Sequence, residues 1–216
     1  NIANLKIEEI KKKRLKKNNV RVAIQAIGLN YVDILMIKGK YQHKIPPPFT
    51  PGIEACGIII EENCNNTKLI NKKVIINKKG GCFSEEIALH LDEIIIIPQE
   101  IDSALAAGTF VNTLTSYVSL CEIIKVKKNQ NILITGASGG VGSASIKLAR
   151  SIGAKTVAIV SSKNKETFVK KLGANKTIML NSKELESISN YRNKYQIDII
   201  LDINGLIKTK KILTSQ

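Results

Sequence analysis

Five glycines within one short stretch offer the clearest chemistry in this sequence. Residues 135–155 read TGASGGVGSASIKLARSIGAK, and the apolar run NILIT at 131–135 leads into them. A strand, a glycine turn and a helix in this order can bind a dinucleotide, because backbone amides at the turn and the helix N-terminus face the pyrophosphate. We expect this role for Ser138, Gly139, Gly140, Val141 and Gly142, and Gly142 would also allow the helix to pack closely on the strand. A purely structural glycine turn is the alternative.

The residues after the next expected strand bear on the type of nicotinamide cofactor. NAD-binding turns usually carry an Asp or Glu about 20 residues after the glycines, where it bonds the ribose 2′-hydroxyl. Here residues 160–166 read VSSKNKE, so serines and lysines follow the strand directly. Hydroxyl and ammonium groups suit a 2′-phosphate, and the pattern therefore favours NADPH. The alternative is that these lysines are solvated residues of a lysine-rich chain.

The sequence has two regions with different apolar patterns, and their strands and helices would position the glycine turn and the serines and lysines. Residues 20–30 alternate apolar with polar or small residues, as a half-buried strand does, and 54–60 and 72–77 continue in the same way. Residues 103–122 switch to helical content and lead into a βα alternation that is typical of a doubly wound sheet. Its expected strands are 131–135, 156–160, 177–180 and 198–203, and its clearest helix, 141–152, ends at Gly153. A six-stranded Rossmann sheet needs two further strands, for which too few residues remain.

Composition excludes several classes of protein. The chain has 216 residues and a formal net charge of +15, and six of the seven residues at 11–17 are basic. Aromatic residues make up only 4% of the chain, so platforms for base stacking are scarce and we do not expect a nucleic-acid partner. The cysteines form no Cys-x-x-Cys pair, and no aliphatic run approaches the length of a membrane span. We expect a cytoplasmic protein with no membrane partner.

Two enzyme families contain a glycine turn of this kind. Residues 135–142 resemble the Thr-Gly-x-x-x-Gly-x-Gly turn of short-chain dehydrogenases and also the x-x-Gly-Gly-x-Gly turn of medium-chain dehydrogenases. The short-chain family places its turn close to the N-terminus and follows it with a Tyr-x-x-x-Lys pair. In this chain more than 130 residues precede the turn, and neither Tyr191 nor Tyr195 is followed by lysine four residues later. The medium-chain family is therefore favoured.

A second stretch narrows this resemblance. Residues 26–60 resemble the zinc-free quinone oxidoreductases, the zeta-crystallin-like branch of the medium-chain family, through Gly-Leu-Asn at 28–30 with Asp33, Gly-Lys-Tyr at 39–41 and Pro-Gly-x-Glu at 51–54. The resemblance implies an α/β protein with a GroES-like β-rich barrel domain at 1–103. A Rossmann-type doubly wound parallel sheet, incomplete at four strands, would follow at 104–216. Asn30 and Ile53 stand where zinc-using relatives carry a cysteine and a histidine ligand, so we expect no metal.

The same resemblance implies an NADPH-dependent, zinc-independent reductase of quinones or α,β-unsaturated carbonyls. Conjugation in such substrates delocalises the charge that hydride transfer creates, so neutral donors can replace a Lewis acid. The family places the Asn30 amide and the Tyr41 hydroxyl there, although a turn-stabilising asparagine and a partly buried tyrosine are equally good interpretations. By the same comparison Asn30 also lies at the cofactor, and the other cofactor-binding side chains are Thr115, Ser161, Lys165 and Asn204.

Departures from the family leave other functions open. Asn204 stands where relatives carry a small apolar residue, and Leu180 or Asn181 replaces a tyrosine that ends the third strand. The last strands of the sheet have no counterpart, which predicts a chain truncated at its C-terminus, whereas the full-length form is expected to be a homodimer. A non-catalytic NADPH- or RNA-binding protein and an enoyl-thioester reductase of the same superfamily are the alternative functions.

Overall fold

The computed structural model describes residues 4–64, 68–179 and 188–205. The chain divides into two compact units, residues 1–111 and 112–216. The division falls inside helix α2 (Ser103–Tyr117), whereas the sequence suggested a boundary at the start of this helix, between residues 103 and 104. Each unit has its own apolar core.

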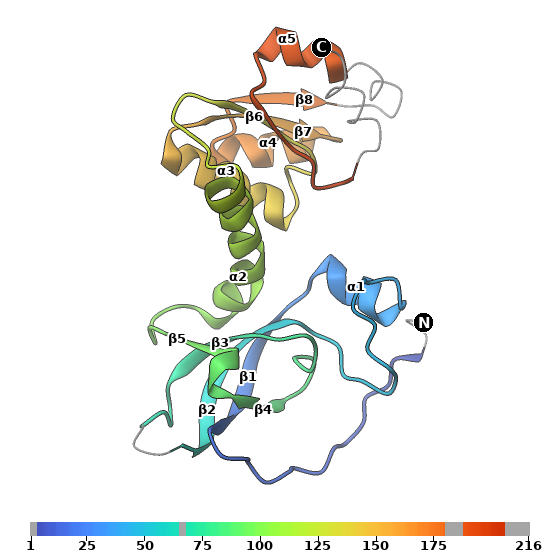
Figure 1. The fold of residues 1–216 in the computed structure, drawn as a ribbon, viewed down its shortest axis with the longest axis vertical. Helices are drawn as coiled ribbons and strands as arrows, with labels where there is room; N and C mark the ends of the chain where they lie inside the picture. The colour runs from blue at the N-terminus through green and yellow to red at the C-terminus, as the bar shows by residue number, and fades with distance from the viewer. Residues whose placement is uncertain (1–3, 65–67, 180–187, 206–216) are drawn as a thin grey trace. The chain divides into compact units, whose positions relative to one another are not determined.

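The first unit is built on a five-stranded antiparallel sheet with the strand order β4-β1-β2-β3-β5 (Figure 1). Its strands are β1 (Asn19–Gly28), β2 (Glu54–Asn63), β3 (Lys73–Asn77), β4 (Glu86–His90) and β5 (Ile94–Ile97). Side chains on one face of the sheet form the core, where Val20, Val22, Ile59 and Leu89 are fully buried. The three strands expected from alternation are confirmed, and the first of them ends two residues early.

Short helices follow two of these strands. Helix α1 (Tyr31–Ile37) begins directly after β1, with Asn30 as its N-cap residue, and a 3-10 turn (Leu91–Glu93) joins β4 to β5. The alternating pattern in the sequence does not end at Gly28, so the change from strand to helix at Asn30 was not expected.

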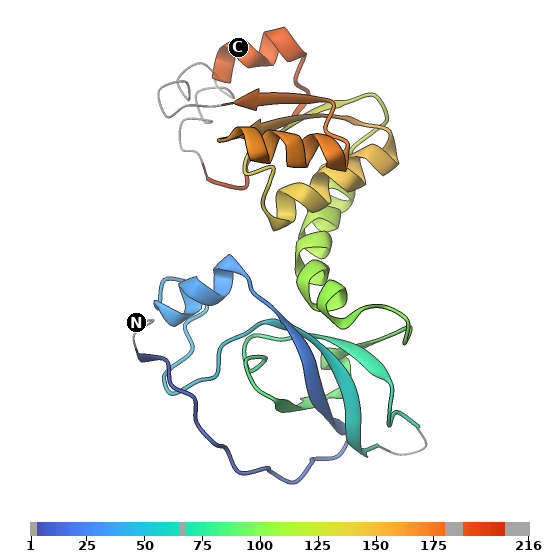
Figure 2. The same cartoon turned by 180° about the vertical axis from the view of Figure 1, so that it is seen from behind.

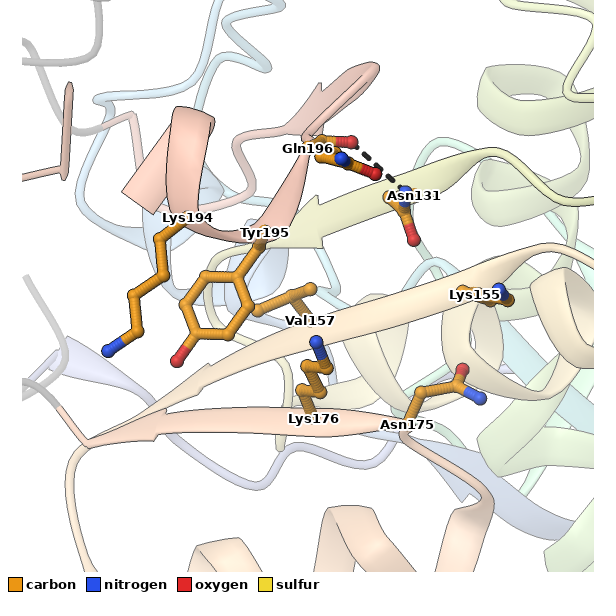
Figure 3. A pocket seen from close by; sticks show the side chains of 8 residues that line it. All are labelled: Asn131, Lys155, Val157, Asn175, Lys176, Lys194, Tyr195 and Gln196. Carbon is orange, nitrogen blue, oxygen red and sulfur yellow. Dashed lines mark hydrogen bonds between the residues drawn. The ribbon is translucent and has the colours of Figure 1, made fainter. Parts of the chain in front are cut away.

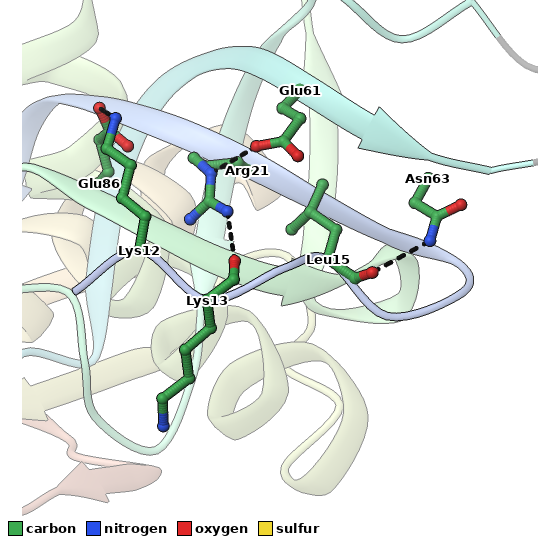
Figure 4. A network of polar contacts seen from close by, with 7 residues as sticks. All are labelled: Lys12, Lys13, Leu15, Arg21, Glu61, Asn63 and Glu86. Carbon is green, nitrogen blue, oxygen red and sulfur yellow. Dashed lines mark hydrogen bonds and ion pairs between the residues drawn. The ribbon is translucent and has the colours of Figure 1, made fainter.

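The basic run at 11–17 is anchored along the first unit (Figure 4). Leu15 is buried, and its carbonyl oxygen accepts a hydrogen bond from Asn63 Nδ2 at 3.0 Å. Arg21 donates to the Lys13 carbonyl at 2.6 Å and pairs with Glu61 at 2.7 Å. The backbone of the run is thus fixed by side chains of the sheet, while all of its lysines are exposed.

The second unit is a parallel sheet with helices on both faces (Figures 1 and 2). Its strand order is β8-β7-β6-β9, and its elements are β6 (Asn131–Ile134), α3 (Gly140–Ile152), β7 (Lys155–Val160), α4 (Lys163–Leu172), β8 (Lys176–Met179), α5 (Ile188–Tyr195) and β9 (Ile199–Leu201). Ile132 and Ile134 pack with α3 and α4, whereas Leu133 packs on the opposite face. The four expected strands and the stop at Gly153, which is left-handed at φ +83°, are confirmed. Leu180 and Asn181 lie outside the described residues.

Helix α2 continues without a break into a π-helical turn (Val118–Ile123), in agreement with the helix expected at 103–122. Among the described residues, Ser103–Ile123 is one helix that could cross a membrane by length and composition. Core helices of globular proteins pass the same test, so this finding is weak evidence for a membrane span.

Candidate functional site

The glycine turn lies at the carboxyl end of β6, in the second unit. Gly136 has a left-handed backbone at φ +59°, a conformation that disfavours a side chain. Gly139 is the extended N-cap residue of α3, and its amide donates to the Gly136 carbonyl oxygen at 2.9 Å. Helix α3 therefore starts at Gly140, and the backbone of residues 138–142 forms the turn and the first helical residues. The N-terminus of a helix attracts anions, so this geometry suits a phosphate group.

The glycines of this turn serve different packing needs. A Cβ atom on Gly142 would lie 2.4 Å from the Gly136 carbonyl oxygen, so Gly142 allows the helix to contact the turn directly. A Cβ atom on Gly140 would lie 2.4 Å from Oδ1 of Asn112, a residue of α2. The space beside Gly140 is therefore occupied by a carboxamide, which sequence reasoning did not find. Gly139 has only the Gly136 carbonyl oxygen nearby, at 3.2 Å.

A buried hydroxyl fixes the start of the turn to the neighbouring strand. Thr135 is fully buried; its Oγ1 donates to Asp202 at 2.8 Å and accepts from the Ile203 amide at 2.9 Å. The amide of Asn204 approaches the same oxygen at 3.3 Å, and the Asn204 side chain lies against Gly136. Asn204, which was expected from the family comparison, is thus placed beside the glycine turn.

A second buried hydroxyl joins α2 to α3. Ser116 is fully buried, and its Oγ lies 2.9 Å from the carbonyl oxygens of Asn112 and Val141 and accepts from Ser145 at 3.0 Å. Thr115, the neighbour expected at the cofactor, is exposed on α2. The sequence motif pointed to Thr115 alone; the burial of Ser116 becomes visible only when the two helices are packed together.

The structure brings Ser161 and Lys165 together at the carboxyl end of β7. Lys165 Nζ donates to Ser161 Oγ at 3.0 Å, and Ser162 caps helix α4 by accepting from the Lys165 amide. Lys163, which the family comparison did not select, forms an ion pair with Glu166 at 2.8 Å. Hydrogen bonds from Lys163, Lys170 and Thr177 lower the pKa of Glu166 to about 2, so Lys163 is neutralised locally. Because β6 and β7 are parallel, the Ser161–Lys165 pair and the glycine turn share one edge of the sheet.

In the first unit, Asn30 contacts two buried carboxylates. Its backbone amide donates to Asp33 Oδ2 at 2.8 Å, and its side-chain Nδ2 donates to Glu54 Oε2 at 3.0 Å. Asp33 is 3% exposed and Glu54 is fully buried. The other oxygen of Glu54 accepts from the Val111 amide of α2 at 3.3 Å. Residue types alone did not single out Glu54 as a partner of Asn30.

Burial dominates the electrostatics around Asn30. Loss of hydration raises the pKa of Asp33 and of Glu54, against the opposite effect of the hydrogen bonds that each carboxyl accepts. The charge of Asp33 adds to the rise at Glu54. Burial, together with these acidic neighbours, also raises the pKa of the Cys82 thiol to about 12. Within the described ranges, neither carboxylate forms an ion pair.

Tyr41 lies in the bend that follows α1, where its ring meets His43 edge to face at a centroid distance of 5.9 Å. The hydrogen bonds of Asn30 are with Asp33 and Glu54, whereas the ring of Tyr41 meets His43. The two donors that the family comparison pairs thus belong to one unit and have different partners. The described residues also hold no group of three or more His, Cys, Asp or Glu side chains that could bind a metal ion, and the absence of a metal stays a prediction.

A cavity of about 340 Å³ opens at the opposite edge of the parallel sheet (Figure 3). It is lined by Asn131, Lys155, Val157, Asn175, Lys176, Lys194, Tyr195 and Gln196. The ammonium groups of Lys176 and Lys194 lie 5.1 and 5.5 Å from the centre of the Tyr195 ring. No residue expected at the cofactor lines this cavity, so it is separate from the glycine turn.

An antiparallel β-rich unit followed by a parallel sheet with a glycine turn defines a two-part, dinucleotide-binding type of protein. The family model "Alcohol dehydrogenase GroES-like domain" matches residues 16–130, and the model "Zinc-binding dehydrogenase" matches residues 140–213. The chain belongs to this family of medium-chain dehydrogenases and reductases, and the resemblance found in the sequence is confirmed.

Several of the similar proteins are named as quinone oxidoreductases. The quinone oxidoreductase-like protein 2 homolog of Nematostella vectensis is 34% identical over 164 residues, which are 74% of this chain and 45% of that protein. The quinone oxidoreductase of Sus scrofa is 26% identical over 193 residues, 87% of this chain and 58% of that protein. The crystal structure of Escherichia coli quinone oxidoreductase complexed with NADPH superposes with a TM-score of 0.82 at 26% identity, covering 95% of this chain and 64% of that one. The chain spans about half the length of the curated relatives it matches.

Proposed function

We propose that this chain carries the NADPH site and part of the substrate site of a zinc-independent reductase, which transfers hydride to a quinone or an α,β-unsaturated carbonyl. The observation that carries the proposal is the Lys165–Ser161 contact at the sheet edge that also holds the glycine turn. An ammonium group and a hydroxyl 3.0 Å apart can together bind a ribose 2′-phosphate. Glu166, the residue that follows Lys165, is already paired with Lys163 and Lys170.

The cofactor would be held mainly by backbone. The amides of Ser138, Gly140, Val141 and Gly142 suit the pyrophosphate, because they stand at the start of α3. The Gly139 amide already donates to Gly136, so Gly139 would contribute through the close approach that its lack of a side chain allows. Asn204 and Thr115 are proposed as further contacts, and the carboxamide of Asn112 lies close enough to Gly140 to join them. NADPH supplies the hydride, whereas the protein orients the two reactants and excludes water.

The substrate oxygen would be met by neutral donors. Asn30 keeps one side-chain N–H after its bond to Glu54, and the Tyr41 hydroxyl is the second candidate. Such donors suffice where conjugation spreads the developing charge, which favours quinones and enones over simple ketones. We propose further that residues 1–103 form the substrate domain and residues 104–216 the cofactor domain of a cytoplasmic, homodimeric protein.

Nicotinamide oxidation tests this function. NADPH and NADH are offered with a panel of quinones, α,β-unsaturated ketones, enoyl thioesters and alcohols, with and without zinc. We expect NADPH-dependent turnover of quinones or enones and no gain from zinc. Turnover of alcohols alone, and only with zinc, would contradict the proposal. Preference for enoyl thioesters, or NADPH binding without turnover but with salt-dependent RNA binding, would instead favour the alternative functions.

A further inference from the structure

Glu54 is a fully buried carboxylate to which the described residues offer no cation. It is the first residue of β2, and it is fully enclosed by neighbouring atoms. A second carboxylate, Asp33, is buried nearby and acts on it electrostatically. Burying an unpaired carboxyl group is costly, and an apolar residue would pack there at lower cost. This cost indicates that the carboxylate oxygens of Glu54 make specific interactions that an apolar side chain could not make.

The two oxygens accept from two different donors. Oε2 accepts from the Asn30 side chain at 3.0 Å, and Oε1 accepts from the Val111 amide at 3.3 Å. Only a group that accepts at both ends satisfies both donors, because the amide of a glutamine would turn an N–H toward one of them. The neighbouring Gly28 allows this arrangement, since a Cβ atom there would lie 2.2 Å from the Ala107 carbonyl oxygen and 2.9 Å from the Glu54 carboxyl carbon.

We propose that Glu54 is the positioning residue for Asn30: its carboxylate holds the Asn30 carboxamide against helix α2, so that the remaining N–H keeps a fixed direction toward a substrate oxygen. This inference rests on the proposed function, in which Asn30 is the donor. It adds a requirement that the function alone does not make, namely that Asn30 works only while Glu54 accepts from it. Asp33 contributes from the other side by fixing the Asn30 backbone at 2.8 Å.

A double-mutant cycle on the full chain tests the inference. The variants are Asn30→Ala, Glu54→Gln and the pair, and Glu61→Gln is the matched control because Glu61 lies on the same strand but pairs with Arg21. We expect each single variant to lower kcat for a quinone about 10-fold, with KM for NADPH unchanged, and the pair to be no worse than either single variant. Glu61→Gln should leave kcat unchanged. Independent, multiplying losses would overturn the proposal.

The side-chain amide resonances of Asn30 supply a readout without turnover. They are assigned by their disappearance in Asn30→Ala, and they should shift in Glu54→Gln but stay in place in Glu61→Gln. Unchanged resonances in Glu54→Gln would overturn the inference even if activity falls. If Glu54→Gln does not fold, Glu54→Asp replaces it, because a side chain shorter by one methylene cannot reach both donors.

Failure of the proposed function is distinguishable from failure of the inference. If Asn30→Ala retains full kcat, or if the unsubstituted chain turns nothing over, the role of Asn30 as a donor falls. The amide resonances of Asn30 then still test whether Glu54 holds the Asn30 side chain, independently of activity. If Asn30→Ala is impaired while Glu54→Gln is active and its resonances are unchanged, the function stands and Glu54 is not the positioning residue.

Discussion

The candidate sites of the two units differ in how far they bury their charged groups. The first buries them: Asp33 and Glu54 are almost fully enclosed, and each holds Asn30 from a different side. The second exposes them at the carboxyl end of a parallel sheet, where the Ser161–Lys165 pair and the glycine turn share one edge. A site made of backbone amides depends on glycines, which have no side chain. A site made of buried carboxylates depends instead on hydrogen-bond partners from distant parts of the chain.

The largest expected effect comes from filling the backbone site. Gly142→Val places a side chain where the Gly136 carbonyl oxygen and Ala137 Cα lie within 2.6 Å of the new Cβ atom. We expect a loss of about 3 kcal/mol in stability and loss of NADPH binding, because α3 must move away from the turn. Thermal unfolding and a fluorescence titration with NADPH would measure both effects.

Gly108→Ala is the control for that substitution. Gly108 also lies in a helix, and a Cβ atom there meets nothing within 4 Å. Alanine should be neutral or stabilising by about 0.5 to 1 kcal/mol, with NADPH binding retained. Equal damage from both substitutions would show that close packing at Gly142 is not what the turn requires.

This contrast explains how much could be predicted from the sequence. The parallel strands, helix α3 and its stop at Gly153 follow from local patterns, and the glycine turn combines such patterns within a few residues. The link between Asn30 and Glu54 spans 24 residues, and that between Glu54 and Val111 spans 57, so no local pattern encodes them. Asn112 and Ser116 were missed for the same reason, since their partners lie on another helix.

The sequence patterns also did not predict the edge strands β4 and β5 or helix α1. The isoleucine run of β5 lacks the alternation that marks a half-buried strand, and β4 is short and follows glycines. Helix α1 has only seven residues, too few to show an apolar stripe. Tertiary pairing with β3 and β1 fixes both strands, which local periodicity cannot anticipate.

Lys165→Ala tests whether the Ser161–Lys165 pair binds the 2′-phosphate of NADPH. Removing the ammonium group beside Ser161 should weaken NADPH binding about 10- to 100-fold and leave NADH binding unchanged, as expected for one lost charge-assisted hydrogen bond. Parallel titrations with the two cofactors measure the change. Lys163→Ala is the matched control, since Lys163 is already paired with Glu166. Equal losses for both lysines would mean that net charge alone attracts NADPH.

Asp33→Asn tests the buried chemistry of the first unit. Because burial raises the pKa of Asp33 above its usual 3.8, its contribution to stability is full below that pH and is lost as the pH rises through the raised value. Asparagine can still accept from the Asn30 amide but does not titrate. The stability of the natural chain relative to the variant should therefore fall as the pH rises from 4 to 8.

Urea unfolding across this pH range measures that difference. Asp92→Asn serves as the control, because its carboxylate is 89% exposed and its removal should not reproduce the trend. A difference that stays constant with pH would show that Asp33 is not held as a buried acid, and the contrast between the two units would lose its electrostatic part.

The smallest effect is expected at Glu166, in helix α4 of the second unit, and its pH dependence has the opposite sign. Hydrogen bonds from Lys163, Lys170 and Thr177 lower its pKa from the usual 4.5 to about 2, so its contribution is present above pH 4.5 and is lost as the pH falls toward 2. Glu166→Gln should lower Tm at pH 7 by about 1 to 2 °C, and the difference in Tm between the natural chain and the variant should narrow at pH 2 to 3.

Glu100→Gln, at an exposed turn, is the control. The Lys163 and Lys170 side chains that pair with Glu166 are 80% and 54% exposed, so added salt should weaken the effect, whereas the trend at the buried Asp33 should persist. Salt sensitivity in both would mean that the two units do not differ in how they shield charge.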